Sequence, residues 1–159
     1  MISHQEMAED NHERVRADKK QAFMLEKAID KLFEERSGLI KRQWGHYKVL
    51  HRGDGFTVKE LTILPGKSLS DQRHFKRDEH WLVVKGTLDI DLEYGCGTKI
   101  HQTINPNPVC FSSYFIPIET WHRPYNAGTE EVKVIETWIG DSTEEDIENC
   151  FYSITKTWT

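Results

Sequence analysis

From Gly38 onward the chain consists of short β-prone runs separated by turns, and this pattern limits the fold more than any other feature. The runs are HYKVLHR, FTVKELTIL, HWLVVKG, TLDIDLEY, SSYFIP and EEVKVIETWIG, with the turn sequences GDG, PG and GCG among them. Strands at intervals of roughly 8–12 residues are typical of an all-β sandwich or barrel. A parallel βαβ arrangement needs helices between its strands, and the sequence leaves no room for them. We therefore expect one all-β domain over residues 39–159.

Two other segments have the composition of helices. The segment that ends at Gly38 is charged, lacks proline and repeats apolar residues at three- and four-residue steps, as an amphipathic helix does. Asn11 suits an N-cap and Gly38 a C′ position, so residues 1–38 are predicted to be a helical extension. Its apolar stripe either packs on the domain or pairs with a second copy in a homodimer. A short helix is also predicted in the tail DSTEEDIENCFYSI, capped by Asp141 or Ser142.

Charge and cysteine usage exclude several classes of protein. The formal net charge of −5 argues against binding to duplex nucleic acid, which usually requires a basic face. The longest apolar run is too short to span a membrane, and the N-terminus has no apolar core of a signal peptide. Three cysteines with no C-x-x-C pair do not suit a disulfide framework. They favour a reducing compartment, so we expect a cytoplasmic protein that acts on a small molecule.

The stretch PGKSLSDQRHFKRDEHWLVVKG contains a possible metal site. Gln72 and His74 are two residues apart, which places both side chains on one face of a strand. Glu79 follows after a short turn, and His122 lies downstream in PIETWHRPYN. An amide oxygen, two imidazoles and a carboxylate form a mixed set that suits Zn, Mn, Fe or Co. Because the chain has eight histidines, some pairing by chance is expected.

The spacing of these residues resembles the two motifs of the cupin superfamily, G-x5-H-x-H-x3,4-E-x6-G and G-x5-P-x-G-x2-H-x3-N. The matching residues are Gly66, His74, Glu79, Gly86, Pro117, His122 and Asn126. The chain departs at Gln72, Phe111 and Glu119, where the family usually has histidine, glycine and glycine. The resemblance implies a cupin fold, a double-stranded β-helix or jelly-roll barrel, with the N-terminal α-helix added. It also implies metal binding by the four residues named above.

A closer resemblance is to the C-terminal domain of type II phosphomannose isomerases, in which the first ligand position is commonly glutamine. The segments that carry it are RQWGHYKVL, FTVKELTILPGKSLSDQRH, RDEHWLVVKGTL, YFIPIETWHRPYN and IETWIGDSTEEDI. It covers about residues 41–147. The chain departs from this family at Phe75 and Lys76, where histidines are expected. This resemblance implies a metal-dependent aldose–ketose isomerase that converts mannose 6-phosphate and fructose 6-phosphate.

Such an isomerisation needs an electrophile on the sugar oxygens, a base near the carbon and cations for the phosphate. Arg77 is the candidate phosphate ligand, ahead of Arg123, because arginine binds phosphate in a bidentate way. Lys85 and Glu119 are candidate bases. His80 is a further candidate, but strand alternation points it away from its neighbour at position 79 and therefore from the metal. The predicted catalytic residues are thus Arg77, Lys85 and Glu119.

Two other functions compete with the isomerase. One is a non-catalytic, metal-containing cupin that binds a sugar or nucleotide-sugar, which the loss of histidines at Phe75 and Lys76 favours. The other is a metal-dependent dioxygenase, which Gln72 disfavours because three-histidine iron sites are the usual arrangement in such cupins.

Overall fold

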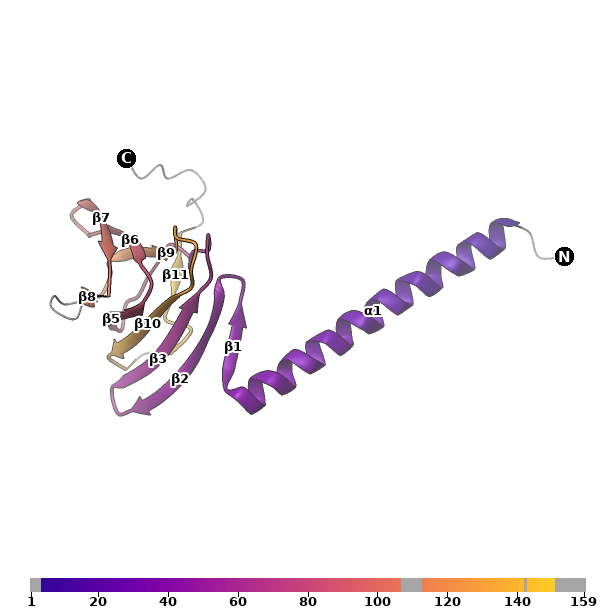
Figure 1. Cartoon of the computed structure of the whole chain (residues 1–159), viewed down its shortest axis with the longest axis horizontal. Helices are drawn as coiled ribbons and strands as arrows, with labels where there is room; N and C mark the ends of the chain where they lie inside the picture. The colour runs from indigo at the N-terminus through magenta and orange to yellow at the C-terminus, as the bar shows by residue number, and fades with distance from the viewer. Residues whose placement is uncertain (1–3, 107–112, 142, 151–159) are drawn as a thin grey trace. The chain divides into compact units, whose positions relative to one another are not determined.

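The computed structural model describes residues 4–106, 113–141 and 143–150, which form two compact units, Met1–Leu39 and Ile40–Thr159 (Figure 1). The first contains the helix α1 (His4–Ser37), which ends before Gly38 at a φ of 67°. The prediction of Gly38 as the C′ residue is confirmed, because glycine adopts this left-handed conformation without steric cost. The predicted start at Asn11 was wrong, since the residues before it contain no glycine or proline to stop the helix. No helix in the described ranges is long and apolar enough to cross a membrane.

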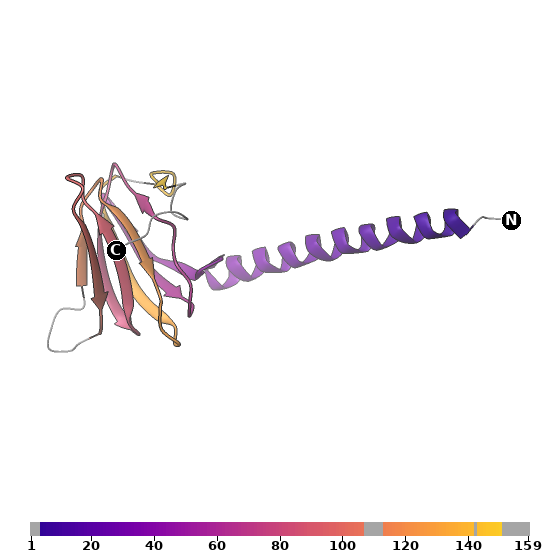
Figure 2. The same cartoon turned by 90° about the horizontal axis from the view of Figure 1, so that it is seen from above.

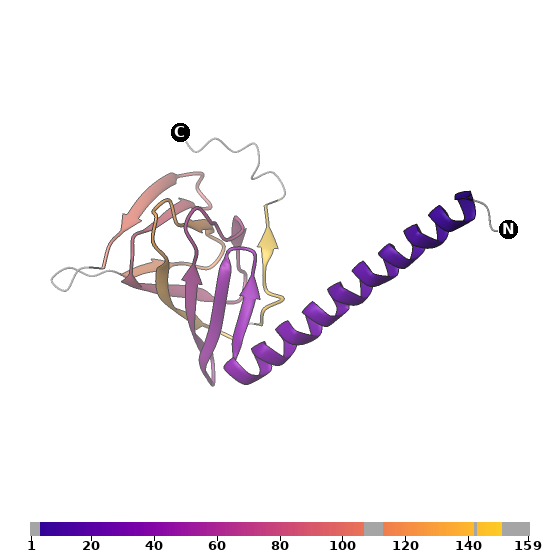
Figure 3. The ribbon, with the colours of Figure 1, turned by 45° about the vertical axis from the view of Figure 1, so that its right-hand side comes forward.

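The second unit consists of two antiparallel sheets, which confirms the all-β prediction. The strands are β1 (Leu39–Arg42), β2 (Gly45–Gly53), β3 (Phe56–Ile63), β4 (Gln72–Arg73), β5 (Asp78–Lys85), β6 (Leu88–Glu93), β7 (Lys99–Ile104), β8 (Ser113–Ile116), β9 (Trp121–Tyr125), β10 (Val132–Ile139) and β11 (Glu148–Asn149). The six-stranded sheet has the order β1-β2-β3-β10-β5-β8 and the five-stranded sheet the order β11-β4-β9-β6-β7. Figures 2 and 3 show the strands of the two sheets arranged around a shared interior.

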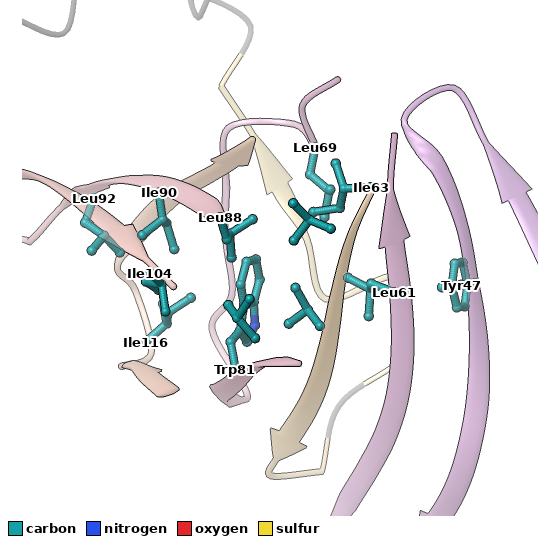
Figure 4. Close-up of a cluster of buried hydrophobic side chains, with 13 residues drawn as sticks. Tyr47, Leu61, Ile63, Leu69, Trp81, Leu88, Ile90, Leu92, Ile104 and Ile116 are labelled. Carbon is teal, nitrogen blue, oxygen red and sulfur yellow. The ribbon is translucent and has the colours of Figure 1, made fainter. Parts of the chain in front are cut away.

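The core lies between the sheets, and alternation along the strands fills it. In β5 and β10 every second side chain is buried, as expected for strands with one face on a core. Trp81 is fully buried beside Leu88 at the centre of the apolar cluster (Figure 4). Its indole N–H is satisfied because it donates to Glu79 Oε2 at 3.1 Å. The same side chain therefore packs the core and orients a candidate metal ligand.

The register of the six-stranded sheet places polar side chains at one end of this interior. Leu61 of β3 pairs with Val134 of β10. At the next inward position Lys59 pairs with Glu136, which also pairs with Trp81 of β5 on its other side. Both Lys59 and Glu136 are buried, although charged residues are rarely buried unless they are paired. The interior thus changes along the strands from an apolar core to a polar end, and the candidate site occupies that end.

The tail over residues 143–150 forms turns and a short strand, so the predicted helix was wrong there; Ser142 and residues 151–154 of that segment lie outside the described residues. The carboxylate of Asp146 accepts hydrogen bonds from the backbone N–H groups of Phe75 and Lys76, at 3.1 Å and 3.0 Å. Glu148 bridges to Arg73 at 2.7 Å as β11 pairs with β4. These acids bond to groups that are distant in the sequence. Such tertiary contacts compete with the helix that acidic residues at its N-terminus would favour locally.

Candidate metal-binding site

Three predicted ligands, His74, Glu79 and His122, converge in the interior from separate segments of the domain. All three are buried, and their donor atoms lie within 4.8 Å of one another. His74 Nε2 is 3.1 Å from Glu79 Oε1, and His122 Nε2 is 3.4 Å from Glu79 Oε2. Ligand atoms that share one ion at about 2.1 Å lie roughly 3.0–3.5 Å apart. The spacing and the donor types therefore fit a single divalent ion.

Backbone carbonyls fix the orientation of both imidazoles. His74 Nδ1 contacts the carbonyl oxygen of Asp146, and His122 Nδ1 lies 3.0 Å from the carbonyl oxygen of Thr120. A carbonyl oxygen only accepts hydrogen bonds, so each Nδ1 carries the proton and donates it. The Nε2 of each ring therefore faces the site, where it can donate to Glu79 while it is protonated, or offer its lone pair to a metal once that proton is lost.

Gln72, the fourth predicted ligand, lies directly opposite His122 in the pairing of β4 with β9. Its amide Nε2 is 3.4 Å from His122 Nε2, while its Oε1 accepts a hydrogen bond from the Ser70 hydroxyl at 3.0 Å. To offer oxygen to a cation, this amide has to turn over, which exchanges two atoms of nearly equal size. Gln72 is therefore in reach of the site, with its oxygen facing away from it.

Arg77 contacts two of the three converging residues, Glu79 and His74. Its Nε donates to Glu79 Oε1 at 2.9 Å, and its Nη2 lies 3.0 Å from His74 Nε2. Its Nη1 donates to the carbonyl oxygens of Thr143 and Asp146. The guanidinium therefore bonds to groups of the protein, whereas we predicted from the sequence that it binds a phosphate. A metal ion would compete with it for a lone pair of His74 and one oxygen of Glu79.

Electrostatics keep Glu79 ionised although it is buried. Burial raises the pKa of its carboxyl, but hydrogen bonds and charge from His122 and His74 outweigh this and hold the pKa well below its usual range. Glu136 behaves in the opposite way: burial, reinforced by the charge of Glu79, raises its pKa to about 8. Glu136 therefore keeps its proton into the neutral range and can donate a hydrogen bond.

A pocket of about 260 Å³ opens beside the cluster. The polar residues that line it include Arg42, Tyr47, Lys59, Gln72, Glu136 and Glu144. Lys59, Glu136 and Glu144 were not predicted as site residues. For Glu136 the sequence did contain an indication, because it falls on the otherwise apolar face of an alternating strand, where a charged residue is unexpected.

The other predicted catalytic residues lie outside the pocket. Lys85 is on the exposed end of β5, where it pairs with Glu131 at 2.9 Å. Glu119 is exposed in the turn before β9. Of the three catalytic predictions, the structure brings only Arg77 to the cluster. His80 is exposed on the outer face of β5, as strand alternation predicts.

The departure from the cupin motif at Glu119 has a backbone consequence. Glu119 has a φ of 63°, and among the described residues it is the one non-glycine with a positive φ. Its backbone N–H donates to the carbonyl oxygen of His74 at 2.8 Å, which holds the turn in this conformation. The glycine that usually stands here meets this requirement without the steric cost of a Cβ.

We expect Glu119→Gly to raise the free energy of unfolding by about 0.5–1 kcal/mol, because relief of the left-handed strain exceeds the added flexibility of glycine. Chemical denaturation followed by tryptophan fluorescence measures the change. Glu145→Gly is the matched control, since Glu145 also lies in an exposed turn but has a negative φ. A loss of stability in the Glu119 variant equal to that of the control would contradict the strain.

Comparisons with known proteins show the family to which the chain belongs. Residues 30–151 match the family described as "Mannose-6-phosphate isomerase C-terminal". The chain is 38% identical over 109 residues to mannose-1-phosphate guanylyltransferase of Salmonella muenchen, which covers 67% of this chain and 21% of that protein. It is 37% identical over 107 residues to the alginate biosynthesis protein AlgA of Pseudomonas aeruginosa, covering 67% and 20%. The chain thus spans about a fifth of the length of these relatives.

Solved structures confirm the cupin fold. The capsular polysaccharide assembling protein CapF of Staphylococcus aureus superposes with a TM-score of 0.61 at 17% identity, covering 70% of this chain and 33% of that one. Oxalate decarboxylase of Lactobacillus farciminis superposes with a TM-score of 0.59 at 14% identity, covering 70% and 32%. At this level of identity the likeness concerns the fold alone.

The predicted sugar-phosphate isomerase activity was wrong. The similar curated proteins are named for guanylyl transfer to mannose 1-phosphate or for alginate biosynthesis, and not for an isomerase. The error arose because a resemblance confined to one domain was used to infer the activity of a whole protein. What the match over residues 30–151 does show is kinship of the domain itself. The chain belongs to the mannose-6-phosphate isomerase C-terminal family of cupin domains.

Proposed function

We propose that this domain holds one divalent transition-metal ion and binds a phosphorylated mannose, as a ligand-binding module without isomerase activity. The observation that carries the proposal is the pocket of about 260 Å³ that is lined by Gln72 and by the cations Arg42 and Lys59. Mannose 1-phosphate is the first ligand to test, because two similar proteins are named mannose-1-phosphate guanylyltransferase.

The ligand chemistry follows from the residues. His74, Glu79 and His122 would hold the ion, with Gln72 as the fourth ligand after its amide turns over. A bound divalent ion supplies a Lewis acid for hydroxyl oxygens of the sugar. With Glu79 as the one carboxylate among these ligands, the site keeps a net positive charge, which favours an anionic ligand. Glu136, which is protonated in the neutral range, offers a hydrogen-bond donor to a sugar oxygen.

Isothermal titration of the purified full chain with mannose 1-phosphate tests the proposal. The protein is stripped with a chelator and then reloaded with one equivalent of Mn²⁺ or Zn²⁺. We expect measurable binding to the reloaded protein, and binding at least tenfold weaker to the stripped protein. At a ligand concentration of 100 times Kd, binding should also raise the free energy of unfolding of the metallated protein by about 2.7 kcal/mol. Failure to retain the metal, or no binding by the metallated protein, would overturn the proposal.

A further inference from the structure

Lys59 is a buried cation on the wall of the pocket. Its side chain is 4% exposed, and its Nζ lies 3.2 Å from the ring centroid of Trp138 and 4.8 Å from that of Tyr47. Burial lowers the pKa of Lys59, and the nearby carboxyl groups of Glu136 and Glu144 oppose this. An ammonium group withdrawn from water in this way needs a close anion.

That anion is the carboxylate of Glu144, which reaches in from the turn after β10. Glu144 Oε1 lies 2.6 Å from Lys59 Nζ, and the Glu144 side chain is 50% exposed. Both residues line the pocket. The contact thus sits where the pocket meets solvent, and one partner is anchored in the sheet while the other approaches from outside.

The turn that carries Glu144 is held by contacts that do not involve Glu144. The Asp146 carboxylate accepts hydrogen bonds from two backbone N–H groups, and Arg77 Nη1 donates to the carbonyl oxygens of Thr143 and Asp146. The Glu144 side chain can therefore swing away from Lys59 while its backbone stays in place. Neighbouring Glu145 is exposed and has no place in the wall of the pocket.

We propose that Lys59 is the subsite for the phosphate of the ligand, and that the Glu144 carboxylate fills this subsite as an internal competitor when no ligand is bound. The inference rests on the proposed function and adds where the phosphate binds and what it displaces. A phosphate monoester has about two negative charges at neutral pH, against one for a carboxylate, so it is the stronger partner for a buried ammonium.

Arg42 provides a second cation for the same subsite. It is exposed, lines the pocket, and its Nη2 lies 3.3 Å from the hydroxyl of Tyr47, whose ring is next to Lys59. Lys59 and Arg42 together offer a point charge and a planar fork, a combination that suits a phosphate. Glu144 occupies the subsite in the free protein. The apparent affinity for the ligand is therefore the intrinsic affinity multiplied by the fraction of molecules in which the contact between Lys59 and Glu144 is open.

Titrations of four metal-loaded proteins test this arrangement: wild type, Glu144→Gln, Glu145→Gln and Lys59→Met. Each is titrated with mannose 1-phosphate and, separately, with mannose. We expect Glu144→Gln to bind mannose 1-phosphate about 5–10-fold more tightly than wild type and to bind mannose within about twofold of wild type. Glu145→Gln should match wild type for both ligands. Lys59→Met should lose most of the preference that wild type shows for mannose 1-phosphate over mannose, with Arg42 as the remaining cation of the subsite.

The outcomes separate the two proposals. If wild type binds mannose 1-phosphate but Glu144→Gln does not bind it more tightly, the internal competitor is refuted while the proposed function stands. An equal gain for mannose also refutes it, because the gain then comes from a wider pocket rather than from a freed phosphate subsite. If no metallated variant binds mannose 1-phosphate, both proposals fail. Lys59→Gln repeats the test should the methionine variant fail to fold, which circular dichroism shows.

Discussion

Replacing Glu79 by glutamine should weaken metal binding more than about 100-fold, because even partners outside the ligand set typically contribute 10- to 100-fold. Glu79 supplies the one carboxylate of the convergent cluster, and its two oxygens face His74 and His122 at 3.1 Å and 3.4 Å. Glutamine has the same size but no charge, so it leaves the double charge of the ion without neutralisation. The substitution thus tests charge and coordination with little change in packing.

Metal content after loading and exhaustive dialysis, measured by mass spectrometry, gives the result. We expect close to one equivalent in wild type and less than about a tenth in Glu79→Gln. His80→Gln is the matched control, because it is the next residue on the same strand but points to the exposed face. It should retain the wild-type content. A full equivalent in Glu79→Gln would show that the ion binds elsewhere.

The strands that were predicted correctly are β2, β3, β5, β6, β8 and β10, all of which come from runs rich in β-branched, aromatic or other apolar residues. β9 was missed because Pro124 lies within it, and proline normally argues against a central strand. Its position is tolerated since β4 pairs with β9 only at Gln72 and His122, and beside Pro124 the neighbouring segment uses only its carbonyl oxygen, which accepts from the Leu69 N–H. β7 was missed because five of its six residues are not buried and show no apolar alternation.

The four candidate metal ligands could be proposed from the sequence because the spacing within each motif is a local property of the sequence. Lys59 and Glu144 are 85 positions apart, and nothing local relates them. Their contact depends on the register that sets Lys59 opposite Glu136, and on the tail forming a turn instead of a helix. Arg77 was assigned to phosphate for its charge, whereas its role follows from burial, which a motif does not show. Contacts of this kind are fixed by tertiary structure alone.

Replacing Arg77 by methionine should lower the free energy of unfolding of the metal-free domain by roughly 3–5 kcal/mol, as is typical when one partner of a buried ion pair is removed. Glu79, which is 1% exposed, loses its guanidinium partner. The carbonyl oxygens of Thr143 and Asp146 lose a donor as well. Urea denaturation in the presence of a chelator measures the loss. Arg73→Met is the matched control, because Arg73 is 30% exposed in its bridge to Glu148 and should contribute less than about 1 kcal/mol.

Saturating Mn²⁺ should then restore more stability to Arg77→Met than it adds to wild type. In wild type the ion has to displace the Arg77 Nη2 contact from His74 Nε2, whereas in the variant that lone pair is already available. The ion also provides the positive charge that Glu79 has lost, and a ligand that binds only the folded state stabilises it in proportion to its affinity. A loss below about 1 kcal/mol without metal would mean that the Arg77 contacts barely exceed the cost of burying its charge. Equal gains from Mn²⁺ in both proteins would mean that Arg77 and the metal do not share ligands, which would place the ion away from His74 and Glu79.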